Sequence, residues 1–156
     1  MLQKQIMPDP SSQTIEPNVP LKDKTWFQTG GPARFFATPT SAQTFKLALE
    51  FAHLHNHAIF LIGHGANILV SDNGVDGLVI RPNMKKISHT NLDTHQALVK
   101  AEAGTSMHDL IAYCLDQNLL GLEEFSGIPG TVGGSVFINL HYFIIKIVYS
   151  FFNIYY

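Results

Sequence analysis

The sequence has little of what several common functions need. Cys114 is the only cysteine in 156 residues, which excludes an internal disulfide framework and a cysteine-based zinc cage. Its neighbours are apolar, so we expect a buried, inert thiol. The formal net charge is -2, which predicts no surface for nucleic acid or for an anionic membrane. No basic segment followed by a hydrophobic run opens the chain, so we expect a cytoplasmic enzyme or binding protein.

The chain is long enough for one domain, or for one domain and a fragment of another. Its hydrophobic fraction of 46% is sufficient for a core. Residues 1–20 are rich in Gln, Ser and Pro, and we expect a disordered arm there. The main domain is expected over residues 21–140, and an aberrant hydrophobic tail over residues 141–156.

Apolar periodicity predicts a mixture of strands and helices. Ser41 is the expected N-cap of the first helix, and Asp76 and Gly77 are expected to form a turn. Strands are expected at residues 33–37, 58–62, 68–70, 78–80 and 97–103, and helices at residues 42–55 and 107–117.

Two groups of ionisable residues have both a functional and a structural interpretation. His53, His55 and His57 end the first helix, where a metal site is one interpretation. A solvated helix end is the favoured one, because histidine suits the helix dipole there and no carboxylate lies close in sequence. Glu123 and Glu124 point in different directions, so they form a poor acid pair. We expect a solvated edge, with one of them anchoring the next loop.

Glycine is concentrated where a ligand loop is expected. Residues 127–134 hold four glycines and Pro129, followed by apolar sequence. Such a loop, opening into a helix, presents a row of N–H groups that favour phosphate or pyrophosphate. The structural alternative is a turn between two core elements. Gly63 and Gly65 follow a predicted strand, but the third glycine of a Rossmann loop is missing, which favours another flavin or nucleotide fold.

Three motifs together carry a family resemblance. They occupy residues 29–33, 63–74 and 121–134, in the order and spacing of the UDP-N-acetylenolpyruvoylglucosamine reductases, also called UDP-N-acetylmuramate dehydrogenases. The chain resembles this family over roughly residues 24–139. Ala66 stands where the family usually has serine, which removes one hydroxyl.

The resemblance implies an α+β FAD-binding domain of the vanillyl-alcohol-oxidase type, made of two small subdomains. It implies FAD as cofactor, with the flavin pyrophosphate lying against the two glycine-rich loops. In the family, NADPH reduces FAD, and the hydride then passes to the enolpyruvyl group of a UDP-sugar in peptidoglycan synthesis. The residues that the resemblance assigns to FAD are Gly63, Gly65, Ala66, Asn67, Ile128, Gly130, Thr131, Gly133 and Gly134.

The chain departs from the family pattern after Asn139. Of the fifteen residues from Tyr142 onward, thirteen are Phe, Ile, Lys, Asn or Tyr, whose codons begin with two A or T bases. Our hypothesis is that this tail is AT-rich DNA read out of frame or past a lesion. A membrane helix over residues 136–156 is the alternative, although polar residues interrupt it. A buried strand is another, and an exposed one would aggregate.

No catalytic or metal-ligating residue is assigned. In the family the substrate-polarising arginine, the proton-donating serine and a late glutamate lie beyond this point, so we expect hydride transfer to be lost or nearly lost. Two other interpretations stay open. One is a non-catalytic FAD- or nucleotide-binding fragment, and the other is a different FAD oxidoreductase of the same fold.

Overall fold

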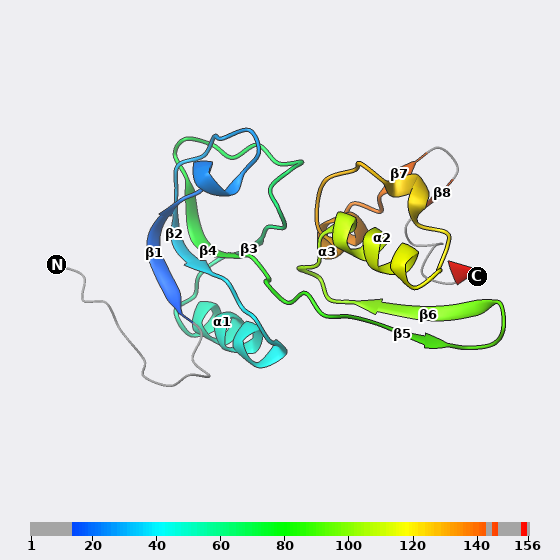
Figure 1. The fold of residues 1–156 in the computed structure, drawn as a ribbon. Coiled ribbons are helices and arrows are strands. Elements are labelled where there is room, and N and C mark those ends of the chain that lie inside the picture. The colour runs from blue at the N-terminus through cyan, green and yellow to red at the C-terminus, as the bar shows by residue number, and fades with distance from the viewer. Residues whose placement is uncertain (1–13, 143–144, 147–153, 156) are drawn as a thin grey trace. The chain divides into compact units, whose positions relative to one another are not determined.

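Four strands form a mixed sheet in the N-terminal part of the chain, in the order β1-β2-β4-β3 (Figure 1). The structure is a computed structural model that describes residues 14–142, 145–146 and 154–155. The chain divides into two compact units, Met1–Asn83 and Met84–Tyr156. Each unit contains both helices and strands, which confirms the predicted α+β class with two small subdomains.

The strands of the first unit are β1 (Ile15–Pro20), β2 (Pro32–Ala37), β3 (Ile59–Leu61) and β4 (Val75–Ile80). β2, β3 and β4 run parallel, and β1 pairs antiparallel with β2. The short 3-10 helix η1 (Lys22–Lys24) lies between β1 and β2, and the helix α1 (Ala42–Leu54) lies between β2 and β3. Parallel neighbours require such crossovers, because a tight turn cannot join them.

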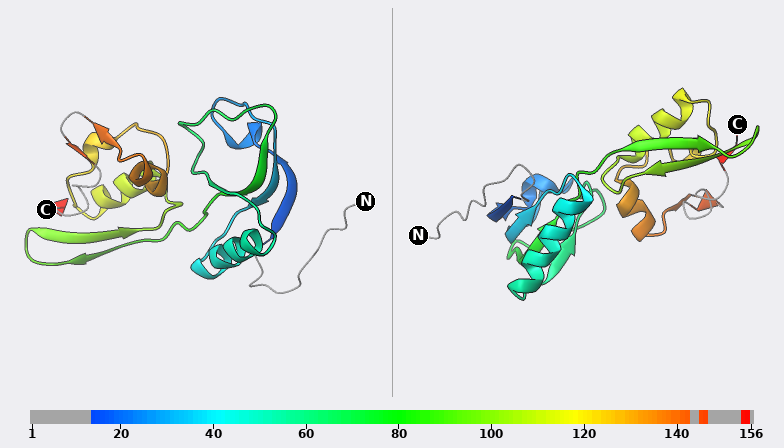
Figure 2. Two further views of the ribbon diagram at one scale, coloured as in Figure 1. Left: turned by 180° about the vertical axis from the view of Figure 1, so that it is seen from behind. Right: turned by 90° about the horizontal axis from the view of Figure 1, so that it is seen from below.

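The helix α1 forms where the sequence predicts it. Ser41 and Thr44 make a capping box, in which each side chain accepts a hydrogen bond from the other residue's N–H group. Ala48 and Ala52 are fully buried on the sheet, and their small side chains let the helix approach closely. Figure 2 shows α1 lying across one face of the sheet.

The two faces of this sheet have separate cores, because side chains alternate along a strand. Leu78 and Ile80 of β4 pack on the α1 side. Val79 packs on the opposite side, with Phe36 of β2 and with Leu21, which precedes η1. The loop from β3 to β4 covers this second face, so the glycine-rich segment within it is held by a packed layer.

The predicted disordered arm is wrong for its last six residues, which form β1. Its register pairs Ile15 with Ala37 and Pro20 with Pro32. Two prolines, Pro17 and Pro20, are tolerated because β1 is an edge strand. Residues 1–13, with the other prolines of the predicted arm, lie outside the described part of the chain.

Two further local predictions are wrong in this unit. The structure describes residues 68–70 but assigns them no strand, and Leu69 is 77% exposed. Asp76 and Gly77, predicted as a turn, lie inside β4. A Cβ on Gly77 would lie 2.5 Å from the carbonyl oxygen of Ala58, so glycine there permits close approach of the neighbouring segment.

The second unit packs a helix on an antiparallel sheet. Its core contains Leu110, Ile111 and Cys114 of the second helix, together with Val99 and Phe125. The strands are β5 (Ile87–Asn91), β6 (Gln96–Ala101) and β9 (Ile154–Tyr155), and the helices are α2 (Met107–Asp116), η2 (Glu123–Phe125) and α3 (Val132–Phe137).

Only short pieces of the predicted tail are described. Two pairs of residues form a small ladder, β7 (His141–Tyr142) with β8 (Ile145–Lys146), and β9 pairs with β6. Residues 143–144, 147–153 and 156 lie outside the described part of the chain, and they include ten of the 21 residues of the alternative membrane segment. Among the described residues, no helix is long and apolar enough to cross a membrane.

Candidate functional site

The first glycine-rich segment, residues 63–67, follows β3 and is called the 63–67 loop. The carboxyl end of a parallel strand is where ligands bind in open α/β sheets. Within the described part of the chain, the N–H groups of Gly63, Gly65, Ala66 and Asn67 donate to no other protein group. Four donors in five consecutive residues are thus available to an anion, since backbone N–H groups in such a turn form anion-binding concavities.

Gly65 holds this loop against the turn that follows η1. Its carbonyl oxygen accepts a hydrogen bond of 3.1 Å from the N–H group of Trp26. Gly65 has a φ of +69°, and a Cβ there would lie 2.4 Å from the carbonyl oxygen of Lys24. Glycine is therefore required by backbone contact as well as by conformation.

The second segment, residues 127–134, is called the 127–134 loop, and it opens into α3 as predicted. The predicted row of open N–H groups is wrong at the start of that helix, because the protein itself uses them. The N–H groups of Val132, Gly133 and Gly134 donate in that order to Thr105 O, Ala103 O and Thr131 Oγ1, at 2.8, 2.9 and 3.2 Å. These bonds fix α3 to the strand-to-helix connection before α2.

Open N–H groups in the 127–134 loop lie before the helix. Among the described residues, the N–H groups of Gly127, Gly130 and Thr131 donate to no protein group, while that of Ile128 donates to Phe125. Gly127 has a φ of +82°, and a Cβ there would meet nothing within 4 Å. A Cβ on Gly130 would meet only the Ser135 hydroxyl, at 3.9 Å. The space beside these two glycines is open.

The nine predicted FAD contacts therefore fall into two groups. Gly63, Gly65, Ala66 and Asn67 belong to the first unit, and the remaining five belong to the second. In the first group the open donors and the predicted residues coincide. In the second, only Gly130 and Thr131 combine a predicted contact with an open N–H group. The N–H group of Gly127 is also open, but Gly127 is not among the nine predicted contacts. The sequence shows that a glycine is present there, whereas only the structure shows that its N–H group has no protein partner.

The ionisable residues considered from sequence have structural surroundings. The Glu123 side chain accepts a hydrogen bond from the N–H group of Gly121, which precedes the pair and is not part of the next loop that one of the two glutamates was expected to anchor. His55 and His57 stack on each other and lie against Phe51. Within the described residues, no three His, Cys, Asp or Glu side chains gather as metal ligands would.

Cys114 is buried, as predicted, and is 2% exposed. Burial, and secondarily the negative charge of Glu123, raise the pKa of the Cys114 thiol to about 11. A neutral, buried thiol is a poor nucleophile, so Cys114 serves the core of the second unit.

The diphosphate of FAD is an anion, and the 63–67 loop offers four backbone N–H groups without a protein partner. An anion there gains hydrogen bonds from donors that the protein leaves open, and no buried partner has to be displaced. Gly65 keeps these donors in place through its contact with Lys24 and Trp26. The residues present therefore fit the cofactor.

Comparison with known proteins gives a consistent result. A family model described as an FAD binding domain matches residues 33–143. UDP-N-acetylenolpyruvoylglucosamine reductase of Treponema pallidum is 38% identical over 123 residues, which are 78% of this chain and 35% of that protein. The Treponema denticola reductase is 40% identical over 127 residues, covering 81% of this chain and 39% of that protein.

Solved structures show the same likeness. The UDP-N-acetylenolpyruvylglucosamine reductase of Thermus caldophilus is 31% identical with a TM-score of 0.68, covering 86% of this chain and 45% of that one. Cholesterol oxidase from Brevibacterium sterolicum, at 18% identity and a TM-score of 0.63, shows a likeness of fold alone. The chain spans less than half the length of each of these relatives.

Proposed function

This chain belongs to the FAD binding domain family, and on that premise we propose that it is the FAD-binding part of a UDP-N-acetylenolpyruvoylglucosamine reductase. The identity of 38–40% with two reductases supports this choice among FAD enzymes. The observation that carries it in the structure is the set of four open N–H groups in the 63–67 loop.

In the proposed reaction, bound FAD supplies the hydride relay between NADPH and the enolpyruvyl double bond of the UDP-sugar. The product would be the lactyl ether used in peptidoglycan. The proposed location is the cytoplasm, where the nucleotide substrates of this reaction are.

The residues of this chain bind and orient the cofactor. The N–H groups of Gly63, Gly65, Ala66 and Asn67 hold the diphosphate, and Gly65 fixes their direction through its contact with the turn at Lys24. Such preformed donors lose little entropy on binding. The predicted contacts of the second unit, Ile128, Gly130, Thr131, Gly133 and Gly134, are proposed as further FAD contacts. For Ile128, Gly133 and Gly134 these contacts use atoms other than the N–H group, which already has a partner.

The test compares two substitutions of nearly equal size at Ala66. Ala66→Glu places a carboxylate beside the open donors, and Ala66→Gln places an uncharged side chain there. We expect the wild-type chain to retain FAD near stoichiometric amounts after removal of free cofactor, measured by visible absorption. Ala66→Glu should lose most of it through charge repulsion, and Ala66→Gln should keep much more.

Circular dichroism controls for folding of both variants. A folded wild-type chain that retains no flavin would contradict the proposal, as would equal retention by the two variants. Any residual NADPH oxidation that depends on the UDP-sugar would separate this reductase from other FAD oxidoreductases of the same fold.

A further inference from the structure

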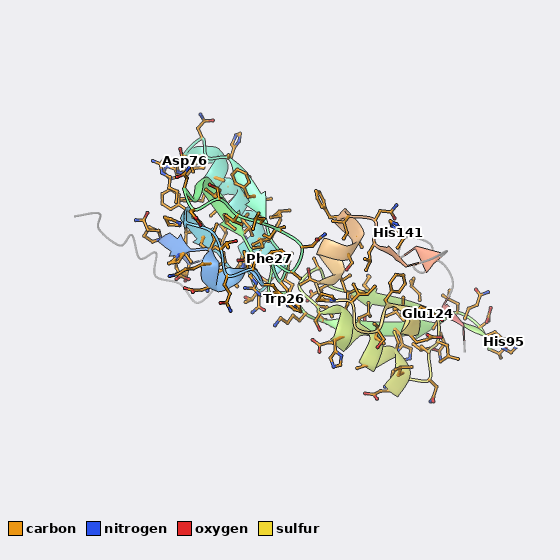
Figure 3. The ribbon with its side chains drawn as sticks, turned by 90° about the horizontal axis from the view of Figure 1, so that it is seen from above. Trp26, Phe27, Asp76, His95, Glu124 and His141 are labelled. Atoms are coloured by element: carbon orange, nitrogen blue, oxygen red, sulfur yellow. The ribbon has the colours of Figure 1, made fainter. Side chains whose placement is uncertain are left out.

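Two large aromatic side chains are exposed in the first unit. Trp26 is 63% exposed and Phe27 is 61% exposed, in the turn that follows η1. Figure 3 shows the two side chains close together, away from Asp76 in the same unit. Single exposed apolar residues are common, but two adjacent aromatics without a covering element in their unit are a candidate binding surface.

Their exposure is imposed by an ordered backbone. Lys24 donates its N–H to the carbonyl oxygen of Leu21 at 2.8 Å, and Gln28 donates to that of Thr25 at 3.2 Å. The Thr25 hydroxyl donates to the carbonyl oxygen of Thr29 at 2.9 Å. Leu21 and Thr25, which both precede the aromatic pair, are buried, and the bond from Thr25 to Thr29 spans the pair. The aromatic side chains are held outward while their neighbours point into the core.

The same turn is in direct contact with the 63–67 loop. Trp26 donates its N–H to the carbonyl oxygen of Gly65, and the loop lies so close that a Cβ on Gly65 would be 2.9 Å from the Cα of Thr25. The turn that carries the aromatic pair therefore adjoins the loop with the four open N–H groups. Nucleotide sites combine these two elements, with polar donors for the phosphates and aromatic faces for the rings.

We propose that Trp26 and Phe27 stack on a planar ring of the flavin nucleotide whose diphosphate is held by the 63–67 loop. This inference rests on the proposed function, because it presumes that the loop takes FAD. FAD carries two planar rings, the isoalloxazine and the adenine, one on each side of the diphosphate. Both offer the flat, polarisable face that an indole or phenyl ring stacks on.

The experiment measures the affinity of the full chain for FAD, FMN and ADP by equilibrium dialysis. The variants are Trp26→Ala, Trp26→Phe and Phe27→Ala. The matched control is Leu54→Ala, which truncates a side chain that is 79% exposed on α1, on the opposite face of the sheet. Loss of one ring stack weakens nucleotide binding by about 5- to 150-fold. We expect a loss of this size for Trp26→Ala with FAD, a smaller one for Trp26→Phe, and none for Leu54→Ala.

FMN and ADP identify the ring. A loss with ADP alone assigns the pair to adenine, and a loss with FMN alone assigns it to the isoalloxazine. Trp26 is the only tryptophan, so quenching of its fluorescence by ADP gives an independent signal of contact. FAD affinity that is the same in wild type, Trp26→Ala and Phe27→Ala would overturn this inference and leave the proposed function standing. A wild-type chain that binds none of the three nucleotides would refute both.

Discussion

Substitution of Gly65 tests the central contact of the first unit. A Cβ at this position would lie 2.4 Å from the carbonyl oxygen of Lys24 and 2.9 Å from the Cα of Thr25. Both neighbours are backbone atoms, so no side chain can rotate away. The loop and the turn must separate, which breaks the hydrogen bond between the Trp26 N–H and the Gly65 carbonyl oxygen.

The cost of Gly65→Ala follows from these parts. A left-handed φ costs an L-residue about 1–2 kcal/mol, and the lost hydrogen bond costs about 1 kcal/mol more. Separation of the packed backbones adds to this, so we expect a total loss of about 2–4 kcal/mol in the free energy of unfolding. FAD binding should fall as well, because the open donors move with the loop.

Gly127 provides a matched control, with a similar φ of +82° but nothing within 4 Å of its Cβ position. Gly127→Ala should cost only the conformational part, about 1–2 kcal/mol. Asparagine tolerates the left-handed region, so Gly127→Asn should be close to wild type. Gly65→Asn should remain unstable, because its Cβ meets the same backbone.

The assay is urea unfolding followed by circular dichroism for all four variants. Trp26 fluorescence adds a signal specific to the first unit for the Gly65 variants. If Gly65→Asn were as stable as Gly127→Asn, conformation alone would explain the glycine. The argument from backbone contact would then be refuted.

Three further substitutions test the cores and the cap. Ser41→Ala removes the capping box with Thr44 and should cost about 1 kcal/mol in thermal unfolding, while Ser41→Asp should restore most of it. Gly133→Ala would place a Cβ 2.8 Å from the Cβ of Ala103, so we expect the free energy of unfolding in urea to fall by about 1–3 kcal/mol. The additional substitution Ala103→Gly should restore part of this loss. Full stability of the Gly133→Ala single variant would contradict the packing argument. The pKa of Cys114 is raised from 9.0 to about 11, so the stability that the neutral thiol contributes, about 3 kcal/mol, is complete below pH 9 and lost as pH rises through about 11. Urea midpoints between pH 8 and 11 should therefore fall more steeply for wild type than for Cys114→Ala, and parallel curves would contradict this.

Local sequence patterns were sufficient to predict the helices and the inner strands. At α1 the cap residue, the apolar spacing and the small side chains of Ala48 and Ala52 all indicate the same element. A prediction from sequence succeeds where capping, apolar spacing and side-chain size all favour the same element. The family resemblance added the two-unit arrangement and the cofactor, which periodicity alone does not provide.

The local predictions that failed depended on tertiary position. Pro17 and Pro20 indicate no strand by themselves, and only the edge position of β1 makes a strand possible. Gly77 lies within β4, where the backbone of Ala58 approaches it closely. This contact joins residues far apart in the sequence, so the local pattern does not indicate it. The apolar residues Ile68 and Leu69 form no strand, although their composition favours one. Strand propensity depends on context in this way.

Glycine density alone is a poor guide to a ligand site in this chain, because glycine is present for two physical reasons. At Gly65, Gly77 and Gly133 a Cβ would collide with the chain's own atoms at 2.4, 2.5 and 2.8 Å, so packing requires glycine with or without a ligand. At Gly127 and Gly130 the φ angles of +82° and +135° favour glycine, while the space beside it stays open. Neither reason is evidence for a bound nucleotide. That evidence is the match to an FAD binding domain, together with the donors that the 63–67 loop leaves without a protein partner. Within the 63–67 loop, substitution of Ala66 therefore tests FAD binding, whereas substitution of Gly65 changes folding as well.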